Sequence, residues 1–346
     1  MSDALKRTDW ADVDVLPPAR AGDISLGLAV ARDDEAFEDA VARSVGELVV
    51  RRPDVVLVNT VEGLATAEAS RRLGVPFCWA IHESYTPAVL WASVFEFGAP
   101  SALAIDAFER CLAAADAVLS VSQETQDLFA LHVHSSRSRV IPFRASMRAE
   151  WRKPSHRDRR WWQIPEDAFL VVSVSTLEER KNPGLLVAAA ARARRLVPNL
   201  HLLLAGPGTS TYGAWLASLA EDEKFSDAFT HVRSEVDVSE LLPLADLYIS
   251  ASDIESRPVV LLEAMEAGVP IVATRACGVA ELVDDGINGL LCPLGDRGAL
   301  ADAIVTLAGA PHRRAELARR ASMMVDSLPA NWADAVVVAM ASVVLA

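Results

Sequence analysis

Short apolar runs alternate along this chain with segments in which apolar residues recur every three or four positions. The runs predict buried strands, and the segments of helical spacing predict helices. The predicted strands are 54–60, 75–81, 116–121, 169–174, 200–205, 245–250 and 269–273, and the predicted helices are 34–51, 65–73, 102–115, 183–195 and 258–267, with another beginning at Ser122. A strand followed by a helix, repeated along the chain, predicts an α/β fold with parallel sheets covered by helices on both faces.

A basic stretch interrupts this alternation at residues 137–162. Its only acidic residues are Glu150 and Asp158, and tryptophans lie among the basic residues. The basic residues are Arg137, Arg139, Arg144, Arg148, Arg152, Lys153, Arg157, Arg159 and Arg160. The change of composition indicates a boundary near 147–160, so we expect one domain over 1–150 and a second over 151–330. We interpret the stretch as a solvated connection; the alternative is a surface that attracts anionic lipid and makes the protein peripheral at a membrane.

Length and composition fit two domains of similar size. The chain has 346 residues, of which 51% are hydrophobic, enough for two cores. Residues 13–16 and 24–30 are short apolar pieces that could be strands or docked loops. Residues 1–10 lack the apolar core of a signal peptide, and no run approaches the roughly 18 apolar residues of a membrane span. We therefore expect a cytoplasmic protein.

Charge and cysteine content narrow the classes of function. The 33 basic residues face 47 acidic ones, and the net charge of −14 disfavours binding to a nucleic-acid backbone. The four cysteines, Cys78, Cys111, Cys277 and Cys292, show no paired spacing. We interpret them as small core residues rather than metal ligands or a disulfide framework.

Residues 251–274 carry the most informative chemistry. Two predicted strands flank a predicted helix. Pro258 suits the first turn of this helix, and Gly268 ends it. Glu255 precedes the helix at the carboxyl end of a strand, where open α/β sheets bind ligands, and Glu263 lies inside the helix. A helix N-terminus attracts phosphate and a carboxylate accepts hydrogen bonds from sugar hydroxyls, so the pattern fits a ligand carrying both groups. The alternative is a loop charge and a solvated helix residue.

The sequence of this region is E-S-R-P-V-V-L-L-E-A-M, followed by G-V-P-I-V-A-T and E-L-V-D-D-G-I-N-G-L-L. It resembles the E-x7-E signature of glycosyltransferase family 4, and the resemblance extends over roughly residues 54–346. It implies the GT-B fold, in which two Rossmann-like domains face a cleft and a C-terminal helix, here 331–346, crosses back to the first domain. It also implies a retaining, metal-independent hexosyltransferase that moves a sugar from a nucleotide diphosphate sugar to a saccharide or lipid-linked acceptor and needs no cofactor.

The same resemblance implies roles for individual residues. Lys181 would neutralise the diphosphate as the sugar–phosphate bond breaks, Glu255 would hold the donor sugar, and Glu263 the ribose hydroxyls. His82, which follows a strand, would lie near the sugar and the acceptor, so the catalytic set is His82, Lys181 and Glu255. The donor-binding set is Arg180, Lys181, Gly206, Glu255, Ser256, Arg257, Pro258, Val259 and Glu263. The alternatives are solvated loop cations at Arg180 and Lys181 and a structural histidine at His82.

Three departures from the family affect these expectations. Thr176 stands where the family has a second basic residue, so either Arg180 substitutes for it or the phosphate is held more weakly. Ser256-Arg257-Pro258 replaces a glycine-rich run, which leaves the choice of sugar open. The family's first strand and Gly-Gly loop do not precede the strand 54–60, so the N-terminal domain looks shortened. We therefore expect association with a second copy or a partner chain there, and weak catalysis by the isolated chain.

Two other functions remain open on this evidence. One is a noncatalytic subunit that binds nucleotide sugar and relies on a companion for activity, which the missing opening favours. The other is a nucleotide-sugar epimerase, which shares the fold. Product analysis with and without an acceptor separates both from a transferase.

Overall fold

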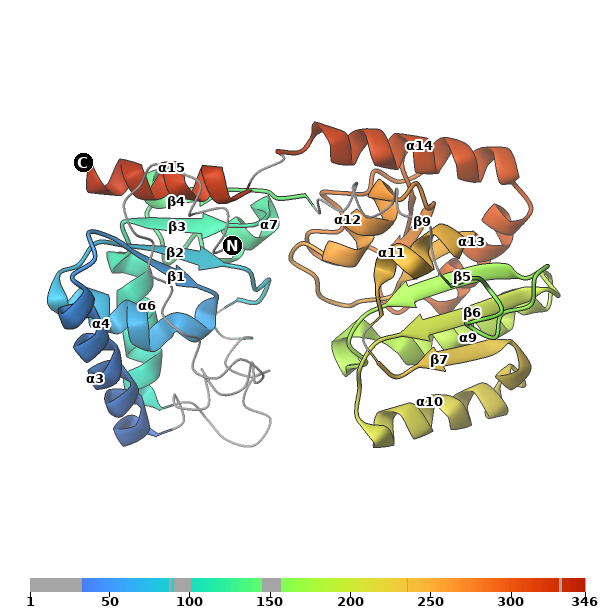
Figure 1. The fold of residues 1–346 in the computed structure, drawn as a ribbon, viewed down its shortest axis with the longest axis horizontal. Helices are drawn as coiled ribbons and strands as arrows, with labels where there is room; N and C mark the ends of the chain where they lie inside the picture. The colour runs from blue at the N-terminus through green and yellow to red at the C-terminus, as the bar shows by residue number, and fades with distance from the viewer. Residues whose placement is uncertain are drawn as a thin grey trace. The chain divides into compact units, whose positions relative to one another are not determined.

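The computed structural model describes residues 33–86, 89, 101–144, 157–234, 236–329 and 332–345. The predicted pieces 13–16 and 24–30 lie outside these ranges. The chain divides into two compact units, residues 1–143 with 331–346 (unit 1) and residues 144–330 (unit 2), as Figure 1 shows. The segment that contains the last helix thus belongs to the same unit as the first half of the chain.

Unit 1 contains a parallel sheet in the order β1-β2-β3-β4. Its strands are β1 (Val56–Asn59), β2 (Phe77–Ile81), β3 (Ala117–Ser120) and β4 (Ser138–Val140). Among the described strands, β1 therefore lies at one edge. The helices between the strands are α3 (Asp34–Arg51), α4 (Leu64–Leu73), α6 (Ala102–Ala114) and α7 (Gln123–Leu128).

Alternation along β2 assigns the two faces of this sheet. Phe77, Trp79 and Ile81 enter one core together with residues of α3, α4 and α6. Cys78 and Ala80 point to the opposite face, where they meet α15 (Trp332–Val344). The sheet is therefore covered on both sides, as the βα repeat predicts, and α15 lies along the face opposite to α4 and α6 in Figure 1.

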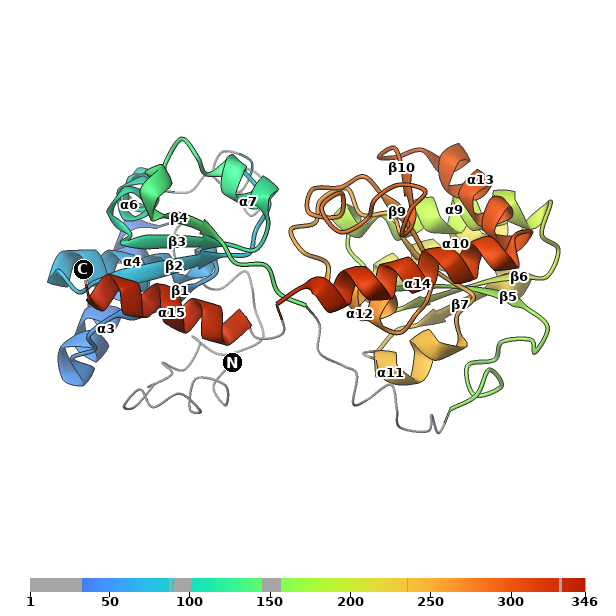
Figure 2. The same cartoon turned by 90° about the horizontal axis from the view of Figure 1, so that it is seen from above.

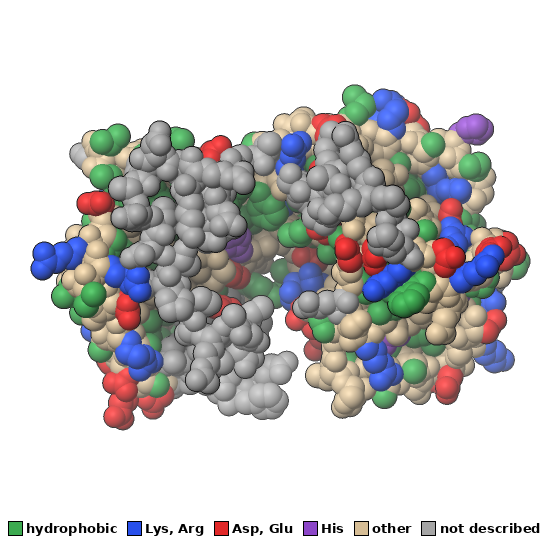
Figure 3. Space-filling model, in the orientation of Figure 1, with side chains coloured by type: hydrophobic (Ala, Val, Ile, Leu, Met, Phe, Trp, Pro, Cys, Tyr) green, Lys and Arg blue, Asp and Glu red, His purple; other side chains and the backbone are tan. Residues whose placement is uncertain are grey.

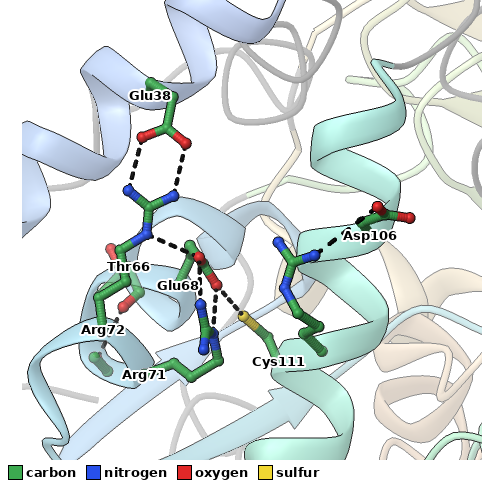
Figure 4. A network of polar contacts seen from close by, with 9 residues as sticks. Glu38, Thr66, Glu68, Arg71, Arg72, Asp106 and Cys111 are labelled. Atoms are coloured by element: carbon green, nitrogen blue, oxygen red, sulfur yellow. Dashed lines mark hydrogen bonds and ion pairs between the residues drawn. The ribbon is translucent and has the colours of Figure 1, made fainter.

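A network of polar side chains joins the three helices on the first face (Figure 4). Glu68 on α4 is only 1% exposed, and it accepts hydrogen bonds from Arg71, Arg72 and the Cys111 thiol of α6. Arg72 also binds Glu38 of α3 through two hydrogen bonds, of 2.7 and 2.6 Å. A buried carboxylate is stable here because charged donors surround it.

Unit 2 contains a larger parallel sheet in the order β10-β9-β8-β5-β6-β7. Its strands are β5 (Phe169–Val174), β6 (Leu200–Ala205), β7 (Phe229–Val232), β8 (Leu247–Ser250), β9 (Ile271–Thr274) and β10 (Leu290–Cys292). The central strands β5, β6, β8 and β9 are almost wholly buried, which is why they read as continuous apolar runs in the sequence.

Helices cover both faces of this second sheet, and Figures 1 and 2 show the two layers. The core on one face combines strand residues with α9 (Pro183–Arg194), α10 (Ser210–Asp222) and α13 (Arg297–Ala308). On the other face, α12 (Val259–Glu266) contacts β8 and β9 and packs against α14 (Pro311–Ser327). A short helix, α11 (Val238–Leu241), precedes β8.

The structure confirms the predicted α/β fold with parallel sheets, and it alters several details. The predicted helix 34–51 and strands 169–174 and 200–205 have the predicted limits. Pro258, expected in the first turn of its helix, has extended backbone and occupies the position before it. Gly268 follows the end of that helix with φ at 75°, a conformation that a glycine adopts without strain. Three cysteines are buried, as expected of core residues, and Cys277 is half-buried.

The hydropathy of the C-terminal region is higher than the count of consecutive apolar residues indicated. Within 311–344 it reaches the level typical of a membrane span. In the structure this region comprises two separate helices, α14 and α15, and Val336 and Ala339 of α15 are buried against the sheet of unit 1. Such a pattern is also that of a core helix in a soluble protein, and it is weak evidence for a membrane.

The described part of the basic stretch is largely paired with acids or carbonyl groups. Arg157 forms an ion pair with Glu240, and its guanidinium lies 5.0 Å from the ring centre of Trp161. Arg159 binds Asp246 and the carbonyl of Ala168. These contacts are those of a structural connection. On the visible face of unit 2, basic and acidic side chains are interspersed (Figure 3).

Candidate functional site

The candidate site of unit 2 lies where two neighbouring strands end. Because β5 and β8 are paired and parallel, the loops that follow them lie side by side. Lys181 belongs to the loop after β5, and Glu255 to the loop after β8. Lys181 Nζ donates a hydrogen bond to Glu255 Oε1 at 2.5 Å, and the two side chains are 14% and 9% exposed. The fold thus joins two residues that are far apart in the sequence in one charged pair.

Further hydrogen bonds fix the Glu255 loop. Ser252 Oγ donates to Glu255 Oε1 at 2.7 Å, and Thr274 Oγ1 donates to the Ser252 carbonyl at 2.6 Å. The backbone N–H of Asp253 donates to the carbonyl of Arg180 at 2.9 Å, which ties this loop to the Lys181 loop. The Glu255 carboxylate is therefore held in position before any ligand arrives.

A cavity of about 310 Å³ opens beside this pair, at the N-terminus of α12. Among the residues of the predicted donor-binding set, six line it; they are Arg180, Lys181, Glu255, Arg257, Pro258 and Val259. Gly206, Ser256 and Glu263 do not line the cavity. Gly206 has φ at 144°, and a side chain there would collide with the carbonyl oxygen of Ser175, so the backbone at this position requires glycine.

Glu263 lies nearby on α12. Burial raises its pKa to about 7, with further contributions from Glu266 and Asp237. Tyr248 lines the cavity, and its phenol pKa is raised by burial and by the charges of Glu255 and Glu263. Both glutamates of the E-x7-E pattern therefore act electrostatically on the same cavity residue.

The two arginines of the site differ in their surroundings. Arg257 is 6% exposed, and burial lowers the pKa of its guanidinium to about 10 against the opposing effect of Glu281, so it remains charged at neutral pH. Arg180 is 38% exposed and forms an ion pair with Glu178 at 2.7 Å. Thr176 also donates to Glu178, at 2.8 Å. Arg180, considered above as a substitute at the Thr176 position, thus already has an acidic partner.

His82 belongs to unit 1, where it follows β2. Its Nε2 lies 3.0 Å from Oδ1 of Asn59, the last residue of β1, and its ring centre lies 5.8 Å from that of Trp332. The neighbouring Glu83 accepts hydrogen bonds from the backbone N–H groups of His82 and Val61. Burial raises the pKa of Glu83 to about 7 against the opposing effect of these bonds.

Several cavity residues were missed by the sequence argument. They share small polar or phenolic side chains near the strand ends; they are Ser173, Ser175, Tyr248, Ser250 and Ser252. The strand-end rule could have found Ser175, Ser250 and Ser252, because each lies at or just beyond the carboxyl end of a predicted strand. No group of three or more His, Cys, Asp or Glu side chains that could hold a metal ion occurs within the described part of the chain.

Each of the two units is an α/β structure built on a parallel sheet, and unit 2 has a cavity at a helix N-terminus lined by a lysine–glutamate pair. This fold is that of the GT-B class of proteins. Solved structures of this class are similar over most of the chain. HepE of Anabaena in complex with UDP has a TM-score of 0.75 at 23% identity, covering 87% of this chain and 82% of that one. Sucrose-phosphate synthase of Thermosynechococcus elongatus has a TM-score of 0.73 at 22% identity, covering 89% and 77%.

Sequence comparisons give the family. Residues 28–143 match the family described as Glycosyltransferase Family 4, and residues 155–323 match Glycosyl transferases group 1. The chain belongs to glycosyltransferase family 4, with the GT-B fold, which confirms the resemblance stated above.

Curated relatives match over part of their length. The putative glycosyltransferase EpsD of Bacillus subtilis is 34% identical over 45% of this chain and 39% of its own length. The D-inositol 3-phosphate glycosyltransferase of Acidothermus cellulolyticus is 30% identical over 78% of this chain and 61% of its own length. The chain thus spans less than two thirds of these relatives.

Proposed function

We propose that this protein is a retaining glycosyltransferase that transfers a sugar from a nucleotide diphosphate sugar to a saccharide or lipid-linked acceptor without a metal ion. The observation that carries the proposal is the buried Lys181–Glu255 pair, which lies beside a cavity at the N-terminus of α12. Such a site offers a cation, a carboxylate and free backbone N–H groups to one ligand. A diphosphate joined to a sugar needs all three.

The geometry supports a division of roles. As the bond between the anomeric carbon and the phosphate oxygen breaks, Lys181 and the N–H groups of Val259 and Val260 stabilise the charge that develops on the diphosphate. Glu255 accepts hydrogen bonds from sugar hydroxyls and holds the Lys181 ammonium. The acceptor oxygen bonds to the anomeric carbon on the face that the phosphate leaves, and its proton passes to a phosphate oxygen. Attack on that face retains the anomeric configuration.

Glu263 completes the donor site in this proposal. Its carboxylate accepts hydrogen bonds from the ribose hydroxyls, which suits a half-buried acid that has no ion-pair partner among the described residues. UDP is the nucleotide bound in the Anabaena HepE structure, and UDP-glucose is bound in a second structure of that protein. UDP-sugars are therefore the first donors to test.

The test is a donor panel scored by thermal shift, followed by product analysis with and without an acceptor. A donor that binds the native state raises the melting temperature, and the active donor should then give a glycosylated product of retained configuration by NMR. Formation of a free epimerised nucleotide sugar without an acceptor would identify an epimerase. Donor binding without turnover, under any acceptor or partner tested, would identify a noncatalytic subunit.

Site variants test the placement of the donor. Lys181→Ala and Glu263→Ala should each weaken binding of the active donor by about ten- to a hundredfold, because each removes a charged hydrogen-bonding group. Both variants should remain folded without ligand, with a lower melting temperature in Lys181→Ala because Glu255 loses its buried partner. Glu221→Ala on the exposed side of α10 is the matched control and should leave affinity unchanged. Unchanged calorimetric affinity in both site variants would exclude this binding mode.

A further inference from the structure

The histidine of unit 1 has a defined hydrogen-bond partner at the end of the neighbouring strand. β1 and β2 are parallel neighbours, with Asn59 opposite Ala80, so the last residue of β1 reaches the residue just beyond β2. His82 Nε2 lies 3.0 Å from Asn59 Oδ1. A carbonyl oxygen can only accept, so this contact requires the proton to be on Nε2.

The other ring nitrogen of His82 is consequently an acceptor. With the proton on Nε2, neutral imidazole carries a lone pair on Nδ1. Within the described residues, Nδ1 makes no hydrogen bond. Burial lowers the pKa of His82, which keeps the ring neutral at pH 7. The adjacent acid, Glu83, accepts a hydrogen bond from the His82 backbone N–H, and Glu62 contributes to the raised pKa of Glu83. A neutral Nδ1 lone pair suits a hydroxyl donor, such as that of a sugar, better than an anion.

Two further contacts hold this arrangement. The Trp332 ring from α15 packs 5.8 Å from the imidazole at an interplanar angle of 54°, which limits rotation of the histidine ring. Thr60, the residue after Asn59, has φ at 65° and ψ at 165°, a region that is almost confined to glycine. A strained β-branched residue persists only where its surroundings fix it, and here the Trp79 indole and the Ala80 carbonyl both bind its backbone.

We propose that Asn59 is a positioning residue that fixes His82 as its Nε2–H tautomer, so that Nδ1 accepts a hydrogen bond from a substrate hydroxyl. The tautomer itself is a property of the free protein. Its use for a sugar hydroxyl rests on the proposed glycosyltransferase function. Asn59 is exposed and its side-chain N–H groups remain available to donate to a second ligand oxygen.

Nuclear magnetic resonance of the histidine ring nitrogens in the ligand-free protein tests this directly. In the wild type, His82 should show a pyrrole-like Nε2 and a pyridine-like Nδ1. The ratio of the Nε2–H to the Nδ1–H tautomer should be about fivefold higher than in an unrestrained histidine, because one neutral hydrogen bond stabilises the Nε2–H form. Asn59→Ala should remove that preference. Asn59→Asp, which keeps an accepting oxygen and adds a charge, should restore it and shift the titration of His82 to higher pH.

A second histidine supplies the control. His201 Nε2 lies 2.8 Å from Thr230 Oγ1 in unit 2, so Thr230→Val should alter the resonances of His201 and leave those of His82 unchanged. An unaltered His82 tautomer in Asn59→Ala would overturn the proposal. Loss of the Nε2–H preference in Asn59→Ala supports the positioning role of Asn59, even if the protein turns over no donor. Failure of the proposed glycosyltransferase function would therefore be recognised separately.

If transfer is found, Asn59→Ala should lower kcat by about fivefold, and Asn59→Asp should recover activity only at a pH above the raised pKa of His82. A structural role alone would lower both variants equally at every pH. Equal loss of activity across the pH range in the two variants would therefore overturn the positioning role.

Discussion

Thr60 occupies a backbone conformation that strains any side chain. Its φ of 65° and ψ of 165° cost of order 1–3 kcal/mol for a residue with a Cβ atom. We predict that the free energy of unfolding of Thr60→Gly exceeds that of Thr60→Ala by about 1–2 kcal/mol. Thr60→Gly should therefore also unfold at the higher temperature. Both variants lose the hydroxyl that accepts a hydrogen bond from the Glu62 N–H, so the comparison isolates the backbone.

Calorimetry of the two purified variants measures the difference. In an unstrained position the glycine variant would be less stable than the alanine variant, because glycine loses more backbone entropy on folding. Equal stability, or the usual order with alanine above glycine, would show that Thr60 is relaxed.

Glu263 gives donor binding a dependence on pH. Its pKa is raised to about 7, chiefly by burial, so the free protein carries a protonated carboxyl below that pH. If the carboxylate is the form that binds ribose hydroxyls, apparent affinity follows the ionised fraction and should fall by about tenfold between pH 7.5 and 6. Isothermal titration across this range measures the effect. Glu263→Gln, which cannot titrate, should bind more weakly and with a flat profile; a similar slope in that variant would assign the titration to another group.

The predictability of the site varies from residue to residue. Lys181 and Glu255 could be found because a resemblance marks them and because the strand-end rule places both loops at one edge of a sheet. The strand-end rule also reaches Ser252 and Asn59, but it does not show which partner either side chain binds. A hydrogen bond between Ser252 and Glu255 depends on the loop conformation, and the contact of Asn59 with His82 depends on which strands are neighbours. Sequence spacing contains neither.

The polar network of Figure 4 connects helices α3, α4 and α6. Burial alone would raise the pKa of Glu68, but hydrogen bonds from Arg71, Arg72 and Cys111 outweigh it and hold the pKa at about 2. We predict that Glu68→Gln lowers the free energy of unfolding by about 2 kcal/mol at pH 7, because a buried charged acceptor is lost while both arginines keep access to water.

The pH dependence of this effect has a definite sign. Glu68 titrates near pH 2 in the folded protein and near 4.5 in the unfolded chain, so its contribution is present above pH 4.5 and disappears as the pH falls toward 2. The difference between the wild type and Glu68→Gln should therefore shrink over that interval. Glu316→Gln on α14 removes a similar contact with two arginines, Arg319 and Arg320, on the surface. That control should show no measurable change in stability.

Three strands that the sequence did not reveal, β4, β7 and β10, each lie at a sheet edge. Their residues are mostly half-buried, and β4 and β7 include polar side chains. A strand covered on both faces needs a continuous apolar run, whereas an edge strand of three or four residues does not. The central strands β5 and β6 were therefore predicted to the residue, while β4, β7 and β10 became visible only through their backbone pairing.

In the proposed function, turnover should proceed without a divalent cation. In the proposed mechanism Lys181 and the N-terminus of α12 stabilise the leaving diphosphate, which is the role that a metal ion fulfils in other transferases. We predict that EDTA leaves the rate unchanged and that added magnesium or manganese raises it by less than about twofold. If EDTA abolishes transfer and either ion restores it, a metal ion rather than Lys181 stabilises the leaving diphosphate.

The helix α15 sets an order of events during synthesis. Its residues Val336 and Ala339 cover the face of the unit 1 sheet that Cys78, Ala80 and Leu119 form, yet they are translated only after the whole of residues 144–330. At roughly 5–20 residues per second, the ribosome needs on the order of 10–40 s to make that intervening segment. Unit 2 is continuous in the sequence and can fold during this interval. During this interval the apolar face of unit 1 lacks the contacts that α15 later provides, so the packing of unit 1 is completed last.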